Sequence, residues 1–271
     1  MAGFRSLRQR MAGGPDPKEV LPLGVEPHLK QPLWTWLEHT CNGDSYGSSG
    51  SWDQLAQALR IDYTGERSHD AVMAAAGADT DLLLDLVDFR LALGTEWSES
   101  SSLTDILFLC GSGYRLTDDT RALEQVVDDT VRAAALAAMD VAEASAAGHL
   151  REAWAATHSR NRNPTQAHAE MVKAVESASR PVVTPKDDKA TLGKIIGQMT
   201  SQAALFSTVG ASDADDGIAA VAAMMQMVWR QQTDRHGANP TIPATQARVE
   251  FLLPVTAALV HAFSTGAILR K

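Results

Sequence analysis

The stretch that decides the fold is Asn163–Ser179, which reads NPTQAHAEMVKAVESAS. It opens with Asn163 and Pro164, residue types typical of the N-cap and the first position of a helix. Apolar residues then recur every three or four positions, as they do on the buried face of an amphipathic helix. These residues are Ala167, Met171, Ala174, Val175 and Ala178. Pro181 and Pro185 are expected to end the helix, because proline cannot continue one.

Helical patterns continue on both sides of this stretch, from about residue 128 to the C-terminus. The expected helices share apolar residues at helical spacing and cover 128–147, 150–159, 191–199, 212–229 and 244–267. Gly148 is expected to interrupt the chain between the first two, since glycine disfavours the helix interior. Residues 128–271 are therefore predicted to form one domain, a helical bundle.

Residues 1–127 are predicted to form a separate, mainly helical unit of unknown role. Its expected helices cover 28–41, 51–59, 68–76 and 79–94. The polar run 96–102 is predicted to be a loop. Three tryptophans of this unit, Trp34, Trp36 and Trp52, form either a partner-binding surface or an aromatic packing cluster. The predicted fold class is all-α.

A small β-hairpin near 106–127 is the one β element that the sequence suggests. Ile106–Cys110 is a short apolar run, and Tyr114–Leu116 resumes it after a glycine break. Asp118 and Asp119 suit a turn, after which 122–127 would return as the second arm. The alternative is two helical pieces separated by the glycines, and the pattern favours neither.

Charge divides the chain unevenly. The net charge is −9 overall, with 11 basic and 23 acidic residues in 1–147 but 13 basic and 10 acidic in 148–271. An acidic total argues against a protein that coats nucleic acid indiscriminately, but the basic half can still bind anions locally.

Several other features set limits on function. Cys41 and Cys110 lack metal-ligand spacing, so we expect reduced thiols, no bound metal and no cofactor. No apolar stretch follows the N-terminal arginines, and the apolar run 251–263 is shorter than a membrane span. A cytoplasmic protein without a membrane association is expected. No P-loop, GxGxxG, GxSxG or HExxH motif is present.

The best candidate site is the polar turn that follows the helix ending at 229. Arg230, a permanent cation, is followed six residues later by His236, which titrates near neutral pH. Arginine binds phosphate oxygens, and histidine transfers protons, so the pair suits cleavage of RNA without metal. Supporting groups are Gln231, Asp234 and Arg235.

A structural interpretation of the same turn competes with the catalytic one. Arginine, aspartate and histidine at a helix C-terminus also complement the helix dipole and form surface ion pairs. Similar Arg–His spacings occur at Arg151–His158 and at Arg162–His168, so the spacing alone does not select Arg230–His236. Its setting in the basic half favours the third pair. His158 and His168 are not expected to bind metal, because no carboxylate or cysteine is suitably spaced.

The stretch from about His149 to the C-terminus resembles the C-terminal domain of bacterial abortive-infection proteins. The residues that carry the resemblance are Asn163-Pro164, Ala167, Ala169, Lys173–Glu176, Pro181–Val183, Lys189–Gly193, Trp229-Arg230, Asp234–Gly237, Ala247 and the final apolar helix through Gly266. Such domains are similar to the HEPN superfamily of helical bundles. The resemblance covers under half of the chain, and 1–125 resembles no family that we can name.

The resemblance implies a metal-independent ribonuclease that works as a homodimer with an Arg-x(4–6)-His motif. The motif falls on Arg230 and His236. Many active members have Asn directly after the arginine, whereas this chain has Gln231, and Arg235 is an alternative cation beside the histidine. RNA is then the substrate, and a regulatory protein partner is a further expectation.

Four more basic residues are candidate RNA contacts. Arg160 and Arg162 lie in a polar loop whose short spacing is expected to keep both exposed; the alternative is a solvated loop without a ligand. Lys189 belongs to a charged loop. Lys173 and Glu176, three residues apart, form either an ordinary helix ion pair or a pair that orients the site.

The function that we expect is therefore an RNase of a bacterial antiviral-defence or toxin system. The alternative is a non-catalytic helical module that binds a protein partner or nucleic acid.

Overall fold

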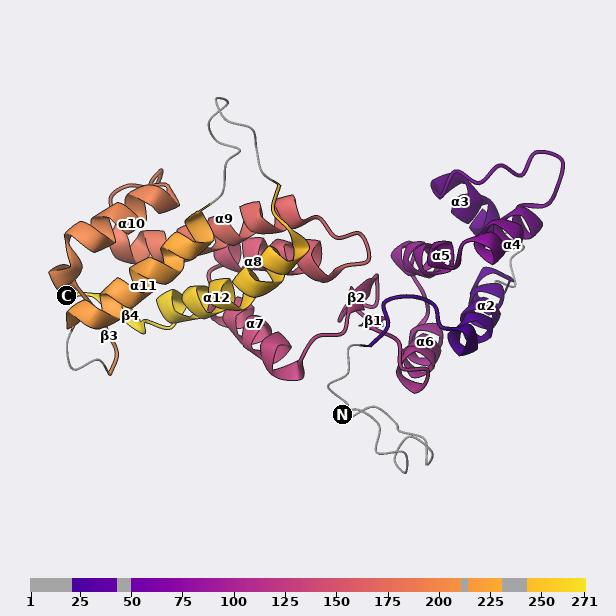
Figure 1. Ribbon diagram of the computed structural model, residues 1–271, viewed down its shortest axis with the longest axis horizontal. Helices are drawn as coiled ribbons and strands as arrows, with labels where there is room; N and C mark the ends of the chain where they lie inside the picture. Colours follow the sequence, from indigo (N-terminus) through magenta and orange to yellow (C-terminus); the bar gives the residue numbers. More distant parts are fainter. Residues whose placement is uncertain (1–20, 43–49, 211–213, 231–242) are drawn as a thin grey trace. The chain divides into compact units, whose positions relative to one another are not determined.

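The computed structural model describes residues 21–42, 50–210, 214–230 and 243–271. The chain forms two compact units, Met1–Val126 and Val127–Lys271 (Figure 1). Both units are mainly helical, with only short strands in two small sheets. The all-α prediction with a small hairpin is confirmed.

The first unit packs helices around a core of leucines and tryptophans. Its elements are α2 (Pro27–Asn42), α3 (Gly50–Ala58), α4 (Ser68–Ala78), α5 (Thr80–Leu93), α6 (Trp97–Leu109), β1 (Tyr114–Leu116) and β2 (Leu123–Gln125). Trp34, Trp36 and Trp52 are buried in this core, so the packing alternative holds for all three. β1 and β2 pair antiparallel, with Arg115 opposite Glu124.

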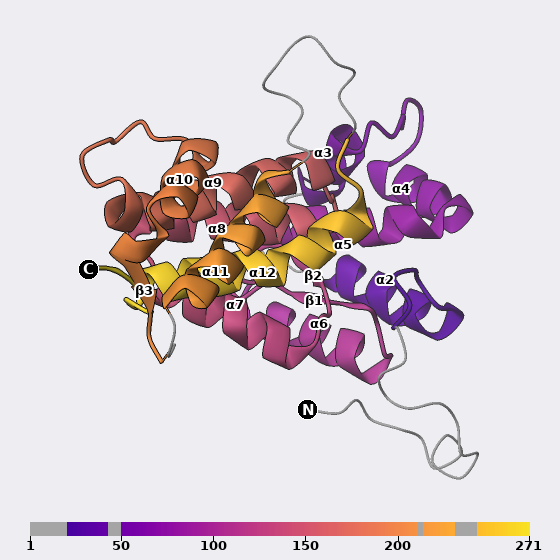
Figure 2. The same ribbon diagram turned by 60° about the vertical axis from the view of Figure 1, so that its left-hand side comes forward.

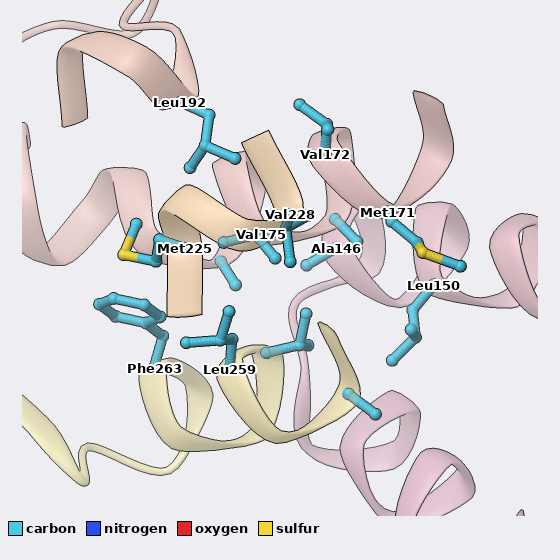
Figure 3. Packing of buried hydrophobic residues seen from close by; sticks show 14 of the residues in the cluster. Ala146, Leu150, Met171, Val172, Val175, Leu192, Met225, Val228, Leu259 and Phe263 are labelled. Carbon is cyan, nitrogen blue, oxygen red and sulfur yellow. The ribbon is translucent and has the colours of Figure 1, made fainter. Parts of the chain in front are cut away.

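The second unit is a bundle closed by a two-stranded ribbon. Its elements are α7 (Asp129–Val141), α8 (Ala144–His158), α9 (Pro164–Val183), α10 (Leu192–Ser201), η1 (Ala203–Leu205), β3 (Phe206–Thr208), α11 (Ala214–Trp229), α12 (Gln246–Ser264) and β4 (Ile268–Arg270). α9 contacts α8, α10, α11 and α12. Figure 3 shows side chains of these five helices meeting in one core, with Met171 and Val175 of α9 among them.

Of the two alternatives for the apolar run 106–110, a strand or a helical piece, the structure shows the helical one. Residues 97–109 form α6, so the loop predicted at 96–102 was wrong. A capping box starts the helix: Glu96 N–H donates to the Glu99 carboxylate, and the Glu96 side chain accepts from the backbone of the same turn. The hairpin is confined to β1 and β2.

Two expected helix boundaries in the second unit were also wrong. The break between α7 and α8 lies at Ala142 and Glu143, and Gly148 is inside α8. Pro181 does not end α9, which continues to Val183. Proline in this last turn removes a single helical hydrogen bond and leaves its ring on the exposed side.

A second β element was missed. β3 pairs antiparallel with β4, bringing Phe206 opposite Arg270 and Thr208 opposite Ile268. Phe206 and Ile268 point into the bundle core and are buried. Three-residue strands this far apart in sequence carry too little pattern to be recognised locally.

α12 is longer than the apolar run expected from the sequence. Among the described helices, α12 alone is long and apolar enough to cross a membrane by length and composition. It also belongs to the bundle, because residues such as Leu252, Val260 and Phe263 are buried in the core. Buried residues make up 44% of its most apolar 18-residue window.

Candidate functional site

Arg230 is the one residue of the predicted catalytic set that the structure describes. It follows the last residue of α11, and its backbone N–H donates to Gln226 O at 2.9 Å, which continues the helical pattern. Its side chain is exposed. Gln231, Asp234, Arg235 and His236 lie in 231–242, outside the described residues.

The last turn of α11 contacts three other helices, two of them through side-chain hydrogen bonds. His168 Nε2, on α9, donates to Val228 O at 2.8 Å. Arg248 Nη2, on α12, donates to Met227 O at 3.1 Å. The carbonyls of Met227 and Val228, in the last turn of α11, thus accept hydrogen bonds from the side chains of neighbouring helices.

The third contact is steric and comes from α10. The ring of Trp229 lies against Gly193 so closely that a Cβ at position 193 would be 2.9 Å from Trp229 Cζ2. Glycine is therefore required there by the space available. Gly193 and Trp229 both belong to the motifs that carry the family resemblance, and in the structure they touch.

Local sequence explains how His168 and Arg248 reach this turn. Asn163 caps α9 by accepting from Gln166 N at 3.1 Å, which places His168 one turn further on the buried face. Thr245 caps α12 by accepting from Arg248 N at 3.3 Å. Arg248 consequently lies in the first turn of α12, beside the end of α11.

Burial is the main cause of a low pKa at His168. The side chain is 4% exposed, and loss of solvent disfavours its charged form. The nearby charge of Arg248 lowers the pKa further, while the hydrogen bond to Val228 O opposes both effects. A neutral imidazole with its proton on Nε2 fits the bond to the carbonyl.

This pKa predicts a pH dependence of stability. The pKa of folded His168 lies below the value of 6.5 expected for the unfolded chain, so the unfolded state takes up a proton first as pH falls. The free energy of unfolding should therefore decrease as pH falls below about 6.5, by at most about 1.4 kcal/mol per pH unit for one group.

Urea titrations between pH 5.5 and 8 would measure this effect. The matched variant is His168→Gln, which keeps a donor but does not titrate. The stability difference between the two chains should change with pH, and a constant difference would contradict the assignment. The pKa of Glu170 is also lowered, but its contribution to the pH dependence of stability falls at a more acidic pH.

Arg160 and Arg162 come to the same end of the second unit as Arg230. They lie between α8 and α9, directly before the cap at Asn163. Gln246 Nε2 donates to Thr157 O at 2.9 Å, so the first turn of α12 also meets the last turn of α8 here. Both arginines are half-buried, which corrects the expectation of two exposed guanidiniums.

Lys173 and Lys189 do not join this group. Lys173 Nζ lies 2.7 Å from Glu170 Oε1, so the expected pair with Glu176 is wrong. Lys189 is exposed in the connection between α9 and α10, near the opposite end of α9. Burial raises the pKa of Glu170, but hydrogen bonds from Lys173 and His149 outweigh it and lower the pKa overall.

Glu176 instead connects α9 with α10. Its Oε1 pairs with Arg180 Nη2 at 2.8 Å, and its Oε2 accepts from Leu192 N at 2.8 Å. Leu192 is the first residue of α10, so a carboxylate from another helix satisfies a helix N-terminus. This capping keeps α10, and with it Gly193, fixed against α9.

Sequence reasoning missed His168, Arg248 and Gly193 as residues that shape the site. His168 was considered only as a non-ligand and as the histidine of the Arg162–His168 spacing, and nothing in the local pattern distinguishes Arg248. A usable sequence signal existed for Gly193, because Gly193 and Trp229 both belong to motifs that carry the family resemblance. His168 and Arg248 belong to the site through burial and through contacts between helices that are distant in the sequence.

Comparison with protein-family models, with curated proteins and with solved structures finds no match for this chain.

Proposed function

We propose that the second unit is a metal-independent endoribonuclease of a bacterial antiviral-defence or toxin system. The observation that supports it most is Arg230: an exposed cation at a helix end that three other helices hold in place. A flexible surface arginine would lose conformational entropy on binding, whereas one projecting from a fixed turn is better preorganised. His236 follows six residues later in the sequence.

The proposed chemistry is transesterification within the RNA strand. A base removes the proton of a 2′-hydroxyl, whose oxygen attacks the adjacent phosphorus while the bond to the 5′-oxygen breaks. A proton then passes to that 5′-oxygen. His236 takes one of these proton-transfer roles, and Arg230 stabilises charge on the phosphoryl oxygens. The products are a 2′,3′-cyclic phosphate and a 5′-hydroxyl.

Arg160 and Arg162 support RNA binding by the same end of the bundle. Together with Arg230 and Arg248 they bring four arginines to the region where α8, α9, α11 and α12 begin or end. Phosphate contacts of this kind position a strand without reading its sequence. The acidic first unit is proposed to restrain the activity of the second, on the basis of the charge difference between residues 1–147 and 148–271.

Incubating the purified chain with RNA in EDTA tests the proposal. Cleavage with cyclic-phosphate ends is expected, and it should fall by at least about 100-fold in Arg230→Ala and in His236→Ala. Arg235→Ala tests the alternative cation. Arg151→Ala and His39→Ala are matched controls, because both residues are exposed and distant in sequence from the turn.

RNA that stays intact in every condition, together with normal growth of cells expressing the protein, would rule the ribonuclease out.

A non-catalytic interaction module is the second candidate. The observation behind it is the exposure of single large apolar side chains in each unit, such as Trp97 at 84% and Val209 at 72%. Exposed large apolar residues mark binding surfaces when they gather. Intact RNA combined with a specific bound partner would select this function.

A further inference from the structure

A cavity lies between α2 and α6 of the first unit, two helices that pack on each other (Figures 1 and 2). The helices run in opposite directions: His28 Nε2 donates to Cys110 O at 2.9 Å at one end, and Trp36 Nε1 donates to Glu99 O at 2.8 Å further along. The volume of the cavity is about 410 Å³, which falls in the range of roughly 300–1,000 Å³ that small-molecule sites occupy.

The lining of this α2–α6 cavity combines an apolar floor with a polar rim. The less exposed apolar residues, which form the floor, are Pro32, Trp36 and Ile106. The exposed residues, which form the rim, carry hydroxyl, amide or imidazole groups and are Gln31, Thr35, His39, Ser98 and Ser102. A mainly apolar site with a few polar groups is the usual composition of a ligand pocket.

Hydrogen bonds fix two of the lining residues in place. The carboxylate of Glu99 accepts from Glu96 N at 2.8 Å, and its Oε2 lies 3.8 Å from Nη2 of the buried Arg90. The same guanidinium nitrogen donates to Thr40 O of α2 at 3.0 Å. The indole of Trp36 is held by its bond to Glu99 O. A ligand would therefore meet a preorganised wall, which lowers the entropic cost of binding.

Charge limits the class of ligand that the cavity can take. None of the nine described residues that line it is a lysine or an arginine. Glu99 lines it, and the exposed charged residues at the start of α6 and along it, Glu96 and Asp105, are also acidic. A phosphate or carboxylate would find no cation in the lining and would be repelled by these groups. Hydroxyl and amide side chains instead both donate and accept hydrogen bonds to neutral groups.

We infer that the α2–α6 cavity binds an uncharged ring compound that carries several hydroxyl or amide groups, of which a free nucleoside is the model. The ring contacts Pro32, Trp36 and Ile106, and the rim bonds the polar groups. Glutamine and glutamate side chains pair with the hydrogen-bonding edges of nucleobases, and Gln31 and Glu99 supply both. The inference concerns the first unit alone and stands independently of the proposed ribonuclease.

Titration calorimetry of the full chain with the four ribonucleosides and their 5′-monophosphates tests the inference. At least one nucleoside is expected to bind with a dissociation constant below about 1 mM. Its 5′-monophosphate should bind at least about 10-fold more weakly, because the phosphate adds negative charge beside Glu99 without a cation to receive it. This comparison separates a free nucleoside from a nucleotide or an RNA strand as the source of the base.

A matched pair of substitutions on α6 locates the binding. Ser102→Phe puts a ring into the cavity and should raise the dissociation constant at least about 30-fold. Thr104→Phe is the control, because Thr104 is exposed on the same helix but does not line the cavity, and it should bind like the parent. Both positions are exposed, so both variants should fold, which circular dichroism and thermal melting check.

The inference would be overturned in three ways. One is the absence of saturable binding of any nucleoside at about 5 mM, well above the expected limit. Another is binding that is unchanged in a folded Ser102→Phe variant. The last is a monophosphate that binds more tightly than its nucleoside, which would assign the cavity to an anionic ligand.

Discussion

His168→Leu is expected to lower the free energy of unfolding by about 1–3 kcal/mol, because it leaves the carbonyl of Val228 buried without its donor. The substitution preserves the apolar packing of a side chain that is 4% exposed. Most of the loss is therefore assigned to the hydrogen bond rather than to a cavity. Urea denaturation at pH 7.5 measures it.

The same substitution should also affect the proposed activity. Loss of the bond from α9 releases the last turn of α11, from which Arg230 projects. Displacement of a catalytic group by about 1 Å can reduce a rate on the order of 100-fold. RNA cleavage by His168→Leu is expected to fall by this order under conditions where the variant is fully folded.

His168→Gln separates the hydrogen bond from the ring. A glutamine amide can donate from nearly the position of Nε2, so this variant should recover most of the stability and most of the cleavage. If glutamine is as damaging as leucine in both measurements, the bond to Val228 O is not what matters at this position. If stability is lost without any change in a measurable activity, His168 does not position Arg230.

Gly193→Ala is expected to lower the free energy of unfolding by about 1–3 kcal/mol, because its Cβ would overlap the Trp229 ring. Relief requires the indole to move, and Trp229 directly precedes Arg230. Hydrogen exchange at the backbone N–H of Arg230, which donates to Gln226 O, should become faster in this variant.

Gly197→Ala is the matched control, in the same helix. A Cβ at position 197 would have nothing within 4 Å, and the residue is exposed. Alanine is a better helix former than glycine, so this variant should gain about 0.5–1 kcal/mol. Opposite signs at the two positions are expected, and equal effects would show that contact with Trp229 is not limiting.

The sequence predicted helices best where local residues fix both ends. Asn163 and Pro164 start α9, and the Asn163 side chain caps the helix as its residue type suggests. Asp79 caps α5 by accepting from Asp81 N, and Gly94 ends it with φ 98°. Such signals act within a few residues, so one sequence is sufficient to find them.

Predictions failed where a local signal was overridden by its surroundings. The serine-rich start of α6 suggested a loop, but the reciprocal bonds of Glu96 and Glu99 stabilise a helix there. Pro181 suggested an end of α9, yet packing of Val183 in the core extends the helix past it. In both cases capping or burial outweighs an unfavourable helix propensity of about 1–3 kcal/mol.

The choice of side-chain partners, near or distant in the sequence, could not be predicted from the linear pattern. The partner of Lys173 is Glu170 instead of Glu176, although both lie three residues away on the same helix. Glu176 is recruited by Arg180 and by the backbone of Leu192, which the linear pattern does not reveal. The support of the Arg230 turn by three helices is of the same kind, since only the folded bundle brings its members together.

The β3–β4 ribbon has a consequence for the order of folding. It joins segments about 60 residues apart and encloses α11 and α12 in the loop between them. Closing such a loop early costs chain entropy before any helix packing offsets it, whereas neighbours such as α8 and α9 meet across a short connection. The ribbon is therefore expected to form late, after α11 and α12 have docked, and its strands should be nearly unstructured in the folding transition state.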